Sequence, residues 1–336
     1  MTNIGINGAG VIGRRMADAI KLQPDMNLIG VIKIKPDYKA RIIQDKGINI
    51  YGADSEANLK MKKAGIDSKG TAEDLVNNVD IMIDATPENI GAKYKPIYEN
   101  SKCKAIFQGG EEHKLTNTSF VAQCNFDESL GKEFVRTVSC NTTALCRSLN
   151  SINELSRINK ARVVIARRAT DPEDNKKGPI DAISLDPITI PSHHGPDVNT
   201  VLPNINITSM AYKIPTTHMH LHSVILTLDN IIEKEEIIKK LEETTRILLV
   251  NSADGFKSTS QILDYGRELG RNRSDIYEAI IWKDSINLIE NELYFYMGVH
   301  QESIVVPENV DAVRALQGKI TANDSIKITN ETLGIK

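Results

Sequence analysis

A glycine-rich turn close to the N-terminus constrains the fold of this chain more than any other feature. An apolar run over residues 4–7 leads into Gly8-Ala9-Gly10-Val11-Ile12-Gly13, and residues 14–22 then follow a helical pattern. A strand, a GxGxxG turn and a helix in this order are typical of a dinucleotide-binding Rossmann unit. Gly8 permits the tight turn, Gly10 lets a pyrophosphate approach the backbone, and Gly13 lets the helix pack on the strand. The pattern predicts a nucleotide-binding domain.

The next strand predicts which dinucleotide is bound. In NAD-specific folds an Asp or Glu about 20 residues after the glycines binds the ribose 2′-hydroxyl. Here residues 28–32 form a β-prone run and are followed by Lys33-Ile34-Lys35. A lysine attracts a 2′-phosphate that a carboxylate repels, so we expect NADP to be accepted and preferred over NAD. The alternative is that Lys33 and Lys35 are solvated loop charges.

Four more β-prone runs extend the first half into a mostly parallel sheet, over residues 79–84, 105–108, 120–121 and 134–138. Ligands of open α/β sheets lie beyond the carboxyl ends of the strands. We therefore expect Thr86 and Pro87, which follow one strand, and Gly110, which follows the next, to lie beside the cofactor.

The second half has a different texture. Residues 161–166, 219–228 and 291–299 read as long strands, residues 231–250 as a helix, and residues 254–269 as a loop and helix. A helix that begins near Pro307 is expected to pack back on the nucleotide domain. The fold class is therefore α/β, with a Rossmann-type domain over residues 1–139 and 303–336. An α+β catalytic domain with one mixed or antiparallel sheet is expected over residues 140–302.

Cys140 stands where the last strand of the first half runs into a helix-forming segment. Helix N-termini stabilise anions, so a thiol there should ionise more easily than free cysteine and serve as a nucleophile. The alternative is a small buried residue that happens to begin a helix.

Polar groups that suit a phosphorylated substrate gather in three later segments. Arg167-Arg168 ends a strand, residues 191–197 (Pro-Ser-His-His-Gly-Pro-Asp) form a polar loop, and Thr216-Thr217 precedes His218, His220 and His222. Arginine binds phosphate through paired hydrogen bonds, although surface ion pairing would also explain two arginines. The three histidines would share one face of a strand. No carboxylate or cysteine lies near them in sequence, so we expect no metal and one histidine facing the thiol.

The bulk numbers exclude several functional classes. A net charge of −3 over 336 residues gives no reason to expect nucleic acid or anionic membrane as a partner. No run is apolar for long enough to span a bilayer, and no signal peptide precedes the first strand, so we expect a cytoplasmic protein. The four cysteines are scattered and suggest neither a disulfide framework nor a zinc site.

Several motifs together resemble one family. Ser139-Cys140-Asn141-Thr142-Thr143 is similar to the active-site signature of phosphorylating glyceraldehyde-3-phosphate dehydrogenases. The archaeal type is indicated by Asp84-Ala85-Thr86-Pro87-Glu88, Phe107-Gln108-Gly109-Gly110-Glu111, the 191–197 loop, Pro215-Thr216-Thr217 and His300-Gln301-Glu302-Ser303. These motifs span nearly the whole chain in the family's order. The resemblance implies a homotetramer that uses NADP, NAD or both.

The resemblance also implies residue roles. Cys140 is the expected nucleophile and His220 the expected base, while His218 stays open as an alternative because the family commonly has an apolar residue there. The expected substrate and phosphate residues are Ser139, Asn141, Thr142, Arg167, His193, His194, Gly195, Thr216 and Thr217. The expected dinucleotide residues are Gly8, Gly10, Val11, Ile12, Gly13, Lys33, Thr86, Pro87, Gly110, Arg168 and Gln301.

The implied reaction oxidises glyceraldehyde 3-phosphate with NAD(P) and inorganic phosphate to 1,3-bisphosphoglycerate, as in glycolysis and, in reverse, gluconeogenesis. One alternative is a cysteine aldehyde dehydrogenase similar to aspartate-semialdehyde dehydrogenase. The paired arginines and His193-His194 argue against it, because its substrate needs no second phosphate site. A remote alternative is an NADP-binding redox sensor, which would not need the histidine and arginine cluster.

Overall fold

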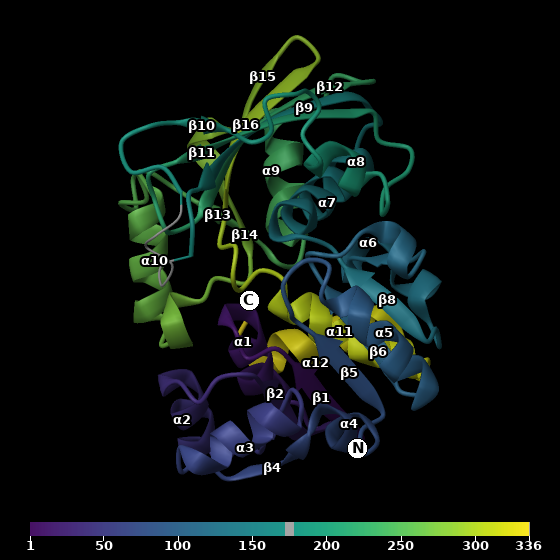
Figure 1. Ribbon diagram of the computed structural model, residues 1–336. Helices are drawn as coiled ribbons and strands as arrows, with labels where there is room; N and C mark the ends of the chain where they lie inside the picture. The colour runs from purple at the N-terminus through teal and green to yellow at the C-terminus, as the bar shows by residue number, and fades with distance from the viewer. Residues whose placement is uncertain (172–177, 336) are drawn as a thin grey trace. The chain divides into compact units, whose positions relative to one another are not determined.

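The computed structural model describes residues 1–171 and 178–335, and the chain in it forms two compact units. The first unit combines Met1–Ser139 with Val306–Gly334, and the second comprises Cys140–Val305. In Figure 1 the first unit therefore carries both the purple and blue start of the chain and its yellow end. Segments from the two ends of the sequence fold together in this unit.

The first unit is an alternation of strands and helices. Its strands are β1 (Thr2–Asn7), β2 (Met26–Lys33), β3 (Ile50–Gly52), β4 (Ser68–Thr71), β5 (Ile81–Asp84), β6 (Lys104–Gln108), β7 (Ser119–Phe120) and β8 (Phe134–Thr137). Its helices are α1 (Val11–Lys21), α2 (Tyr38–Asp45), α3 (Ser55–Lys63), α4 (Ala72–Val76), α5 (Gly91–Asn100), α6 (Ala122–Asn125), α11 (Val306–Gln317) and α12 (Ala322–Leu333).

The eight strands form one parallel sheet in the order β4-β3-β2-β1-β5-β6-β8-β7. The chain moves outward from β1 in one direction through β4 and then returns to continue from β5 in the other. Such a reversal opens a crevice beyond the carboxyl ends of the two central strands, where α/β proteins bind ligands. The predicted Rossmann-type sheet is confirmed, and Gly8 and Ala85 follow its two central strands.

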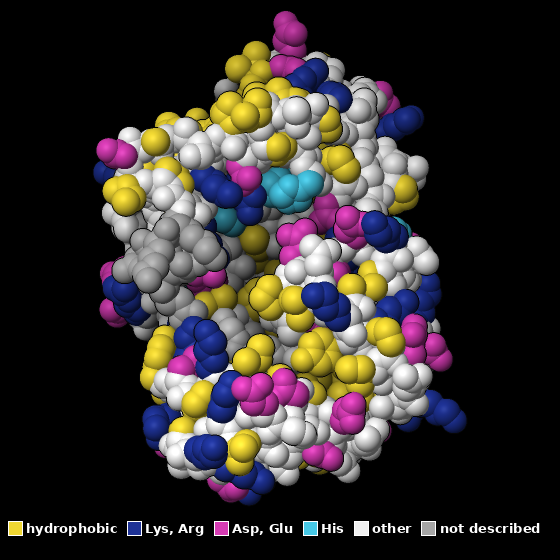
Figure 2. All heavy atoms as spheres, in the orientation of Figure 1, with side chains coloured by type: hydrophobic (Ala, Val, Ile, Leu, Met, Phe, Trp, Pro, Cys, Tyr) yellow, Lys and Arg dark blue, Asp and Glu magenta, His cyan; other side chains and the backbone are white. Residues whose placement is uncertain are grey.

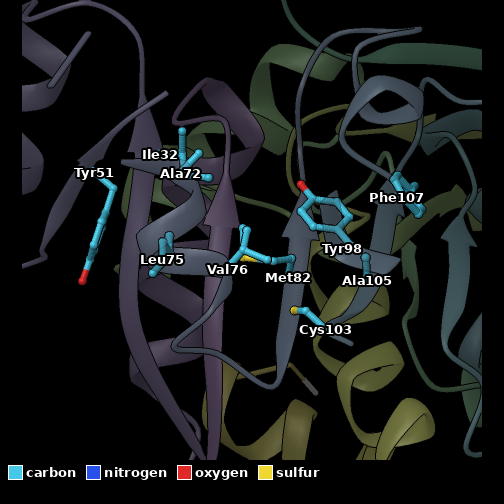
Figure 3. Packing of buried hydrophobic residues seen from close by; sticks show 10 residues of the cluster. All are labelled: Ile32, Tyr51, Ala72, Leu75, Val76, Met82, Tyr98, Cys103, Ala105 and Phe107. Atoms are coloured by element: carbon cyan, nitrogen blue, oxygen red, sulfur yellow. The ribbon is translucent and has the colours of Figure 1, made fainter. Parts of the chain in front are cut away.

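Buried apolar side chains fill the space between this sheet and its helices. The cluster comprises Ile32, Tyr51, Ala72, Leu75, Val76, Met82, Tyr98, Cys103, Ala105 and Phe107. Figure 3 shows residues of the strands and of α4 and α5 converging there, with the Tyr98 hydroxyl at the edge. That hydroxyl donates to the buried Asp84 carboxylate at 2.7 Å, and Asn7 Nδ2 donates to the same oxygen at 3.0 Å. The core thereby ties together the ends of β1 and β5.

The C-terminal helices belong to the first unit through a fully buried arginine. Arg314 of α11 donates to both Asp25 carboxylate oxygens at 2.7 and 2.8 Å, to Gln23 at 2.8 Å and to Thr329 of α12 at 2.7 Å. A buried charge is tolerated only when it is paired and hydrogen-bonded, and this one is both. The contact fastens α11 and α12 to the end of α1 and the start of β2.

The second unit has longer strands and fewer helices. Its strands are β9 (Ile158–Arg168), β10 (Ser184–Leu185), β11 (Ile207–Ile214), β12 (His220–Leu228), β13 (Ile247–Val250), β14 (Ala279–Trp282), β15 (Asn287–Ile289) and β16 (Glu292–Val299). Its helices are α7 (Cys140–Asn153), α8 (His194–Val198), α9 (Lys234–Glu243) and α10 (Thr259–Glu268).

These strands form a mixed sheet in the order β10-β11-β9-β12-β16-β14-β13, with β15 added beside β16. The β9–β11 and β13–β14 pairs are parallel and the other pairs antiparallel. Burial alternates along β12, because one face of this strand packs inside the unit and the other is only partly buried. The helix α7, buried on almost every side after Cys140, lies on the packed face (Figure 1). The predicted α+β domain with a mixed sheet is confirmed.

The prediction of one helix over residues 231–250 is wrong for the second half of that range. The helix α9 ends at Glu243, and Ile247–Val250 forms β13 instead. Thr244 leaves the helical conformation and Arg246 adopts a positive φ of 60°, which ends the helical path. The β-prone sequence that follows then pairs with β14. Among the described residues, no helix is both long and apolar enough to cross a membrane.

Candidate active site

Cys140 is the first residue of α7 and follows β8 after only Val138 and Ser139. The predicted junction between strand and helix is therefore confirmed. Cys140 is partly exposed, whereas the residues behind it, from Asn141 to Leu149, are buried. Cys140 thus begins a helix whose body is fixed inside the second unit.

The ionisation of this thiol differs from the expectation. Burial raises the pKa of Cys140, and this effect outweighs the charges of Arg167 and Arg168 and the N–H groups at the helix start, which lower it. The prediction that the helix terminus alone makes the thiol more acidic than free cysteine is wrong. Removing the thiolate from water destabilises it by more than the helix N-terminus stabilises it. Arg167 and Arg168 are the positive charges that lower the pKa of this thiol.

His220, the first residue of β12, is buried beside the same arginines. The antiparallel register sets Leu221 opposite Ala166, which puts His220 opposite Arg167 on the packed face of the sheet. The backbone N–H of Arg168 donates to His220 Nδ1 at 3.0 Å, so the neutral ring carries its hydrogen on Nε2. Burial, aided by the charge of Arg167, lowers the pKa of His220 well below its usual value, and the ring is neutral.

His218 lies elsewhere. Met219 has a positive φ of 61°, so the chain turns there and the extended strand begins only at His220. The exposed His218 ring bonds to the hydroxyl of its neighbour Thr217 at 2.9 Å. The prediction that three histidines share one face of the strand is therefore wrong, since only His220 and His222 lie on it. Among residues 1–171 and 178–335, no three metal-binding side chains gather in one place.

The Asn141 side chain joins two buried histidines at the first turn of α7. His222 Nε2 donates to Asn141 Oδ1 at 2.8 Å, and Asn141 Nδ2 donates to His194 Nε2 at 3.1 Å. Both assignments follow from the amide, whose oxygen only accepts and whose nitrogen only donates. His194 must then carry its hydrogen on Nδ1, which lies 3.1 Å from the Ser192 hydroxyl.

The chain of hydrogen bonds continues into the sheet. The Ser192 hydroxyl lies 2.8 Å from that of Ser209 on β11, which also accepts from Gly195 N–H at 2.8 Å. The exposed His193 packs on His194 with ring centroids 3.9 Å apart. Thr142 adds a second link to this loop by donating to Asp197 at 2.7 Å. Asn141, Thr142, His193, His194 and Gly195, all expected around the substrate, are thus brought together in the second unit.

Two other expected substrate residues are not part of this cluster. Thr216 lines a cavity of about 430 Å³ with His218, Trp282 and Tyr296, and the cavity also includes Ala166 and Leu221. Side chains alternate between the faces of a strand, so Ala166 and Leu221 mark the face opposite to His220. Thr217 precedes the turn at Met219 and bonds to His218. Gln301 accepts from Met219 N–H at 2.9 Å and so holds this turn in place.

The glycine-rich turn of the first unit has the geometry of a phosphate-binding loop. Gly8 has a positive φ of 94°, and a side chain there would meet the Ala85 carbonyl at 2.9 Å. A Cβ on Gly13 would lie 1.8 Å from the Gly8 carbonyl, so only glycine lets α1 approach β1. Nothing lies within 4 Å of a Cβ built on Gly10, which leaves that side of the backbone open. Val11 and Ile12 begin α1, whose N-terminus faces an anion favourably.

A cavity of about 430 Å³ extends from this turn along the carboxyl ends of β1 and β2. Its lining includes Gly8, Gly10, Thr86 and Pro87, which were expected around the cofactor, and also Lys33, Lys35 and Lys39. Gly110 approaches the neighbouring loop, with a built Cβ 3.1 Å from Glu88 Cα. The residues present suit a dinucleotide, since the lining of the cavity combines the glycine-rich turn before α1 with three lysines.

The region 139–293 matches the family model described as glyceraldehyde 3-phosphate dehydrogenase, C-terminal domain. The chain is 47% identical to a glyceraldehyde-3-phosphate dehydrogenase of Methanobrevibacter smithii, with the whole of both chains covered. It is 48% identical to those of Saccharolobus islandicus and Methanothermobacter thermautotrophicus, and these alignments cover all of this chain and 98% and 100% of the relatives. The chain belongs to the glyceraldehyde-3-phosphate dehydrogenase family.

Two charged residues beside the cluster, Lys213 and Asp186, were not identified from the sequence. Lys213 on β11 is paired in register with Arg167 on β9, and Asp186 forms ion pairs with both. Histidine side chains and Lys or Arg side chains lie close together on the surface of the second unit that Figure 2 shows. The alternation of apolar residues over 207–214 could have revealed β11 and its register, whereas nothing in the sequence points to Asp186.

The buried histidines predict a loss of stability in acid. Burial lowers the pKa of His194 to about 2 and that of His222 to about 3, against about 6.5 in the unfolded chain. Below about pH 6.5 these histidines are protonated in the unfolded chain but stay neutral in the folded chain. The free energy of unfolding therefore falls as the pH falls towards their folded-state pKa values. Each histidine contributes a slope of about 1.4 kcal/mol per pH unit. The fluorescence of Trp282, the one tryptophan of the chain, reports urea unfolding of the second unit at each pH.

The variant His222→Gln keeps a donor for Asn141 but does not titrate. We expect its slope between pH 6 and pH 4 to be shallower than that of the unmodified protein by about one proton. His218→Gln is the matched control, because His218 is exposed, and it should leave the slope unchanged. Equal slopes in His222→Gln and the unmodified protein would contradict a neutral His222 in the folded state.

Proposed function

We propose that the protein is a phosphorylating glyceraldehyde-3-phosphate dehydrogenase that oxidises D-glyceraldehyde 3-phosphate with NAD(P) and inorganic phosphate. The observation that carries the proposal is Cys140 at the first turn of α7, next to a hydrogen-bonded histidine network and two arginines. A cysteine nucleophile explains the thiol, and a phosphorylated aldehyde explains the positive charge around it. Full-length identity to relatives of that name supports the same substrate.

Cys140 attacks the aldehyde carbon as the thiolate. The new C–S bond gives a thiohemiacetal, and its oxygen carries the electron pair of the former carbonyl bond. The positive charges of Arg167 and Arg168 favour the thiolate that starts this step. Asn141 uses one amide hydrogen for His194, and we assign the other, with the backbone N–H groups at the helix start, to the oxyanion.

A bound nicotinamide would supply the acceptor for the hydride that leaves the thiohemiacetal carbon. Loss of the hydride and of the hydroxyl proton leaves a thioester on Cys140. Inorganic phosphate then attacks the thioester carbon, the C–S bond breaks, and 1,3-bisphosphoglycerate leaves as the thiolate returns. Arg168 and Gln301 are the residues of the second unit that we assign to the cofactor, and Ser139 lies next to Cys140 at the substrate.

His220 is the base that we assign to the hydroxyl proton. Its burial, its neutral state and its place opposite Arg167 support this role. In the present structure its Nδ1 accepts from Arg168 and its hydrogen is on Nε2, which suits it to donate to the substrate oxygen. Proton uptake at Nε2 therefore requires the contact with Arg168 N–H to open and the ring to change tautomer.

We expect Cys140→Ser to abolish phosphate-dependent reduction of NADP by glyceraldehyde 3-phosphate, because a hydroxyl is a far weaker nucleophile than a thiolate. His220→Asn should slow the hydride-transfer step by about 100-fold or more, which is typical of removing a general base. The measurement is the rise in absorbance at about 340 nm, where reduced nicotinamide absorbs. It is made with and without phosphate and with each cofactor in turn.

Matched controls lie close in the chain. Cys124→Ser changes a cysteine of the first unit, and His218→Asn changes the exposed neighbour of His220; both should keep nearly full activity. Substantial turnover by Cys140→Ser would remove Cys140 from its role. A larger loss in His218→Asn than in His220→Asn would reassign the base, and turnover without phosphate would reject the phosphorylating reaction.

NADP is the cofactor that we propose to be preferred. Lys33, Lys35 and Lys39 line the same cavity as the glycine-rich turn, and positive charge there suits a 2′-phosphate. Lys33 is held by Asp37 at 2.8 Å, and Asp37 also accepts from the N–H groups of Lys39 and Ala40 at the start of α2. Lys33 is thus fixed at the cavity rather than free in solvent.

The cofactor proposal predicts that Lys33→Gln lowers the preference for NADP over NAD. The ratio of the two kcat/KM values should fall by more than about tenfold, or about 1.4 kcal/mol, because only NADP loses a charge partner. Lys69→Gln removes an exposed lysine of β4 and serves as the control. Equal losses with both cofactors would contradict contact between Lys33 and the 2′-phosphate.

A homotetramer is the assembly that we propose. Large apolar side chains are exposed in the second unit, on the outer face of its sheet and from the residue before β10 to the start of α8. They include Met210, Tyr296, Ile183, Leu185, Ile188 and Ile190. Ile188 is 81% exposed and Tyr296 52% exposed, and soluble monomers rarely carry so many such side chains together. Contact with further copies of the chain would remove this apolar surface from water.

Light scattering of the purified protein should give the mass of four chains. The double variant Ile188→Asp with Tyr296→Asp should give a smaller assembly, because each charge would be buried without a partner. Leu59→Asp, at an exposed position of α3 in the first unit, should leave the mass unchanged. A monomeric unmodified protein would reject the proposed assembly.

A further inference from the structure

Arg167 and Lys213 form a pair of cations on the packed face of the second sheet. They lie on the neighbouring parallel strands β9 and β11 and are directly paired in register, so their side chains leave the same face side by side. His220 continues this row on the other side of Arg167. The charge of Arg167 acts on Cys140, His194 and His220, which places it among the groups assigned to the reaction.

A carboxylate already lies between these cations. One oxygen of Asp186 accepts from Arg167 Nη1, and its other oxygen lies 3.5 Å from Lys213 Nζ. The side chain of Asp186 is 23% exposed, and those of Arg167 and Lys213 are 26% and 37% exposed. Solvent, and therefore a small anion, can reach all three.

The sheet itself delivers Asp186 to this position. The residues before it form β10, in which Ser184 pairs with Lys213 and Leu185 with Tyr212. The backbone N–H of Asp186 then donates to the Ala211 carbonyl at 3.0 Å, which extends the ladder by one more bond. The carboxylate is consequently fixed beside the cations by backbone hydrogen bonds and does not depend on a flexible side chain alone.

One carboxylate does not use the full binding capacity of the pair. Two positive charges face one negative charge, and Arg167 Nε is buried with no hydrogen-bond partner among the described residues. A phosphate group carries up to two charges and three acceptor oxygens, which match a guanidinium and an ammonium better than a carboxylate does. The arrangement has unused donors that point to a stronger anion than Asp186.

We propose that Arg167 and Lys213 bind a phosphate group during the reaction and that Asp186 is a built-in competing anion that limits the affinity for it. The inference rests on the proposed function and deepens it by naming the residue that sets phosphate affinity. The phosphate is that of the aldehyde substrate or the inorganic phosphate that attacks the thioester, and the two sources share this chemistry. When either arrives, Asp186 gives up its ion pairs.

The test is Asp186→Asn in the full-length protein. Asparagine keeps the shape of the side chain and an oxygen for Arg167 but removes the competing charge. We expect the KM for one phosphate ligand to fall by about three- to tenfold, the range of a partly exposed charge pair. KM is measured separately for glyceraldehyde 3-phosphate and for inorganic phosphate, and the ligand whose KM falls is the one bound here.

Two further variants make the result decisive. Lys213→Met should raise the KM of the same ligand by a similar factor, while Asp181→Asn, an exposed carboxylate of the same segment, should change neither KM. An unchanged or higher KM for both ligands in Asp186→Asn would overturn the proposal. So would equal effects of Asp181→Asn and Asp186→Asn.

A binding measurement separates this proposal from the proposed function. Calorimetric titration with inorganic phosphate, or with glyceraldehyde 3-phosphate in the Cys140→Ser background, reports affinity without turnover. Asp186→Asn should tighten one of these by the same factor. Tighter binding in a protein that lacks dehydrogenase activity would support the phosphate site and reject the reaction. Normal activity with unchanged affinities would do the reverse.

Discussion

The bridge that Asn141 makes between His194 and His222 is the interaction on which the candidate site depends. Asn141 directly follows Cys140, and its two amide atoms bind one histidine from the sheet and one from the start of α8. Buried polar groups are costly unless they are satisfied, so each member of this chain holds its neighbour to one orientation. The first turn of α7, and with it Cys140, is fixed through that chain.

The same burial that orders this network sets its electrostatics. Histidines kept out of water stay neutral, so they donate and accept hydrogen bonds in one fixed direction across the neutral pH range. Burial also raises the pKa of the thiol, and the charges of Arg167 and Arg168, with the N–H groups at the helix start, act in the opposite direction. Arg167 is the stronger of the two arginine charges acting on Cys140, and it is paired with Asp186.

Local sequence patterns predicted the elements that carry their own signal. Gly8 and Gly13 are required by backbone geometry, and the apolar runs after them are long enough to identify the parallel sheet. Residues 231–250 were assigned to one helix because the strand Ile247–Val250 has no apolar period that separates it from a buried helix. The pKa of Cys140 and the partner of Lys213 could not be predicted, since both depend on segments that are distant in sequence and meet only through the register of the second sheet.

Each of the two proposed anion sites has a carboxylate of the same chain beside its cation, next to Lys33 in one and next to Arg167 in the other. A cation built to bind phosphate has no ligand for part of the catalytic cycle, and a half-buried charge without a partner is unfavourable. Asp37 and Asp186 supply that partner in the first and second units. If both cations bind phosphate as proposed, each carboxylate also opposes the incoming ligand, so the free protein is stabilised at the expense of ligand affinity. Such a site would bind its anion reversibly, as the proposed reaction requires in either direction.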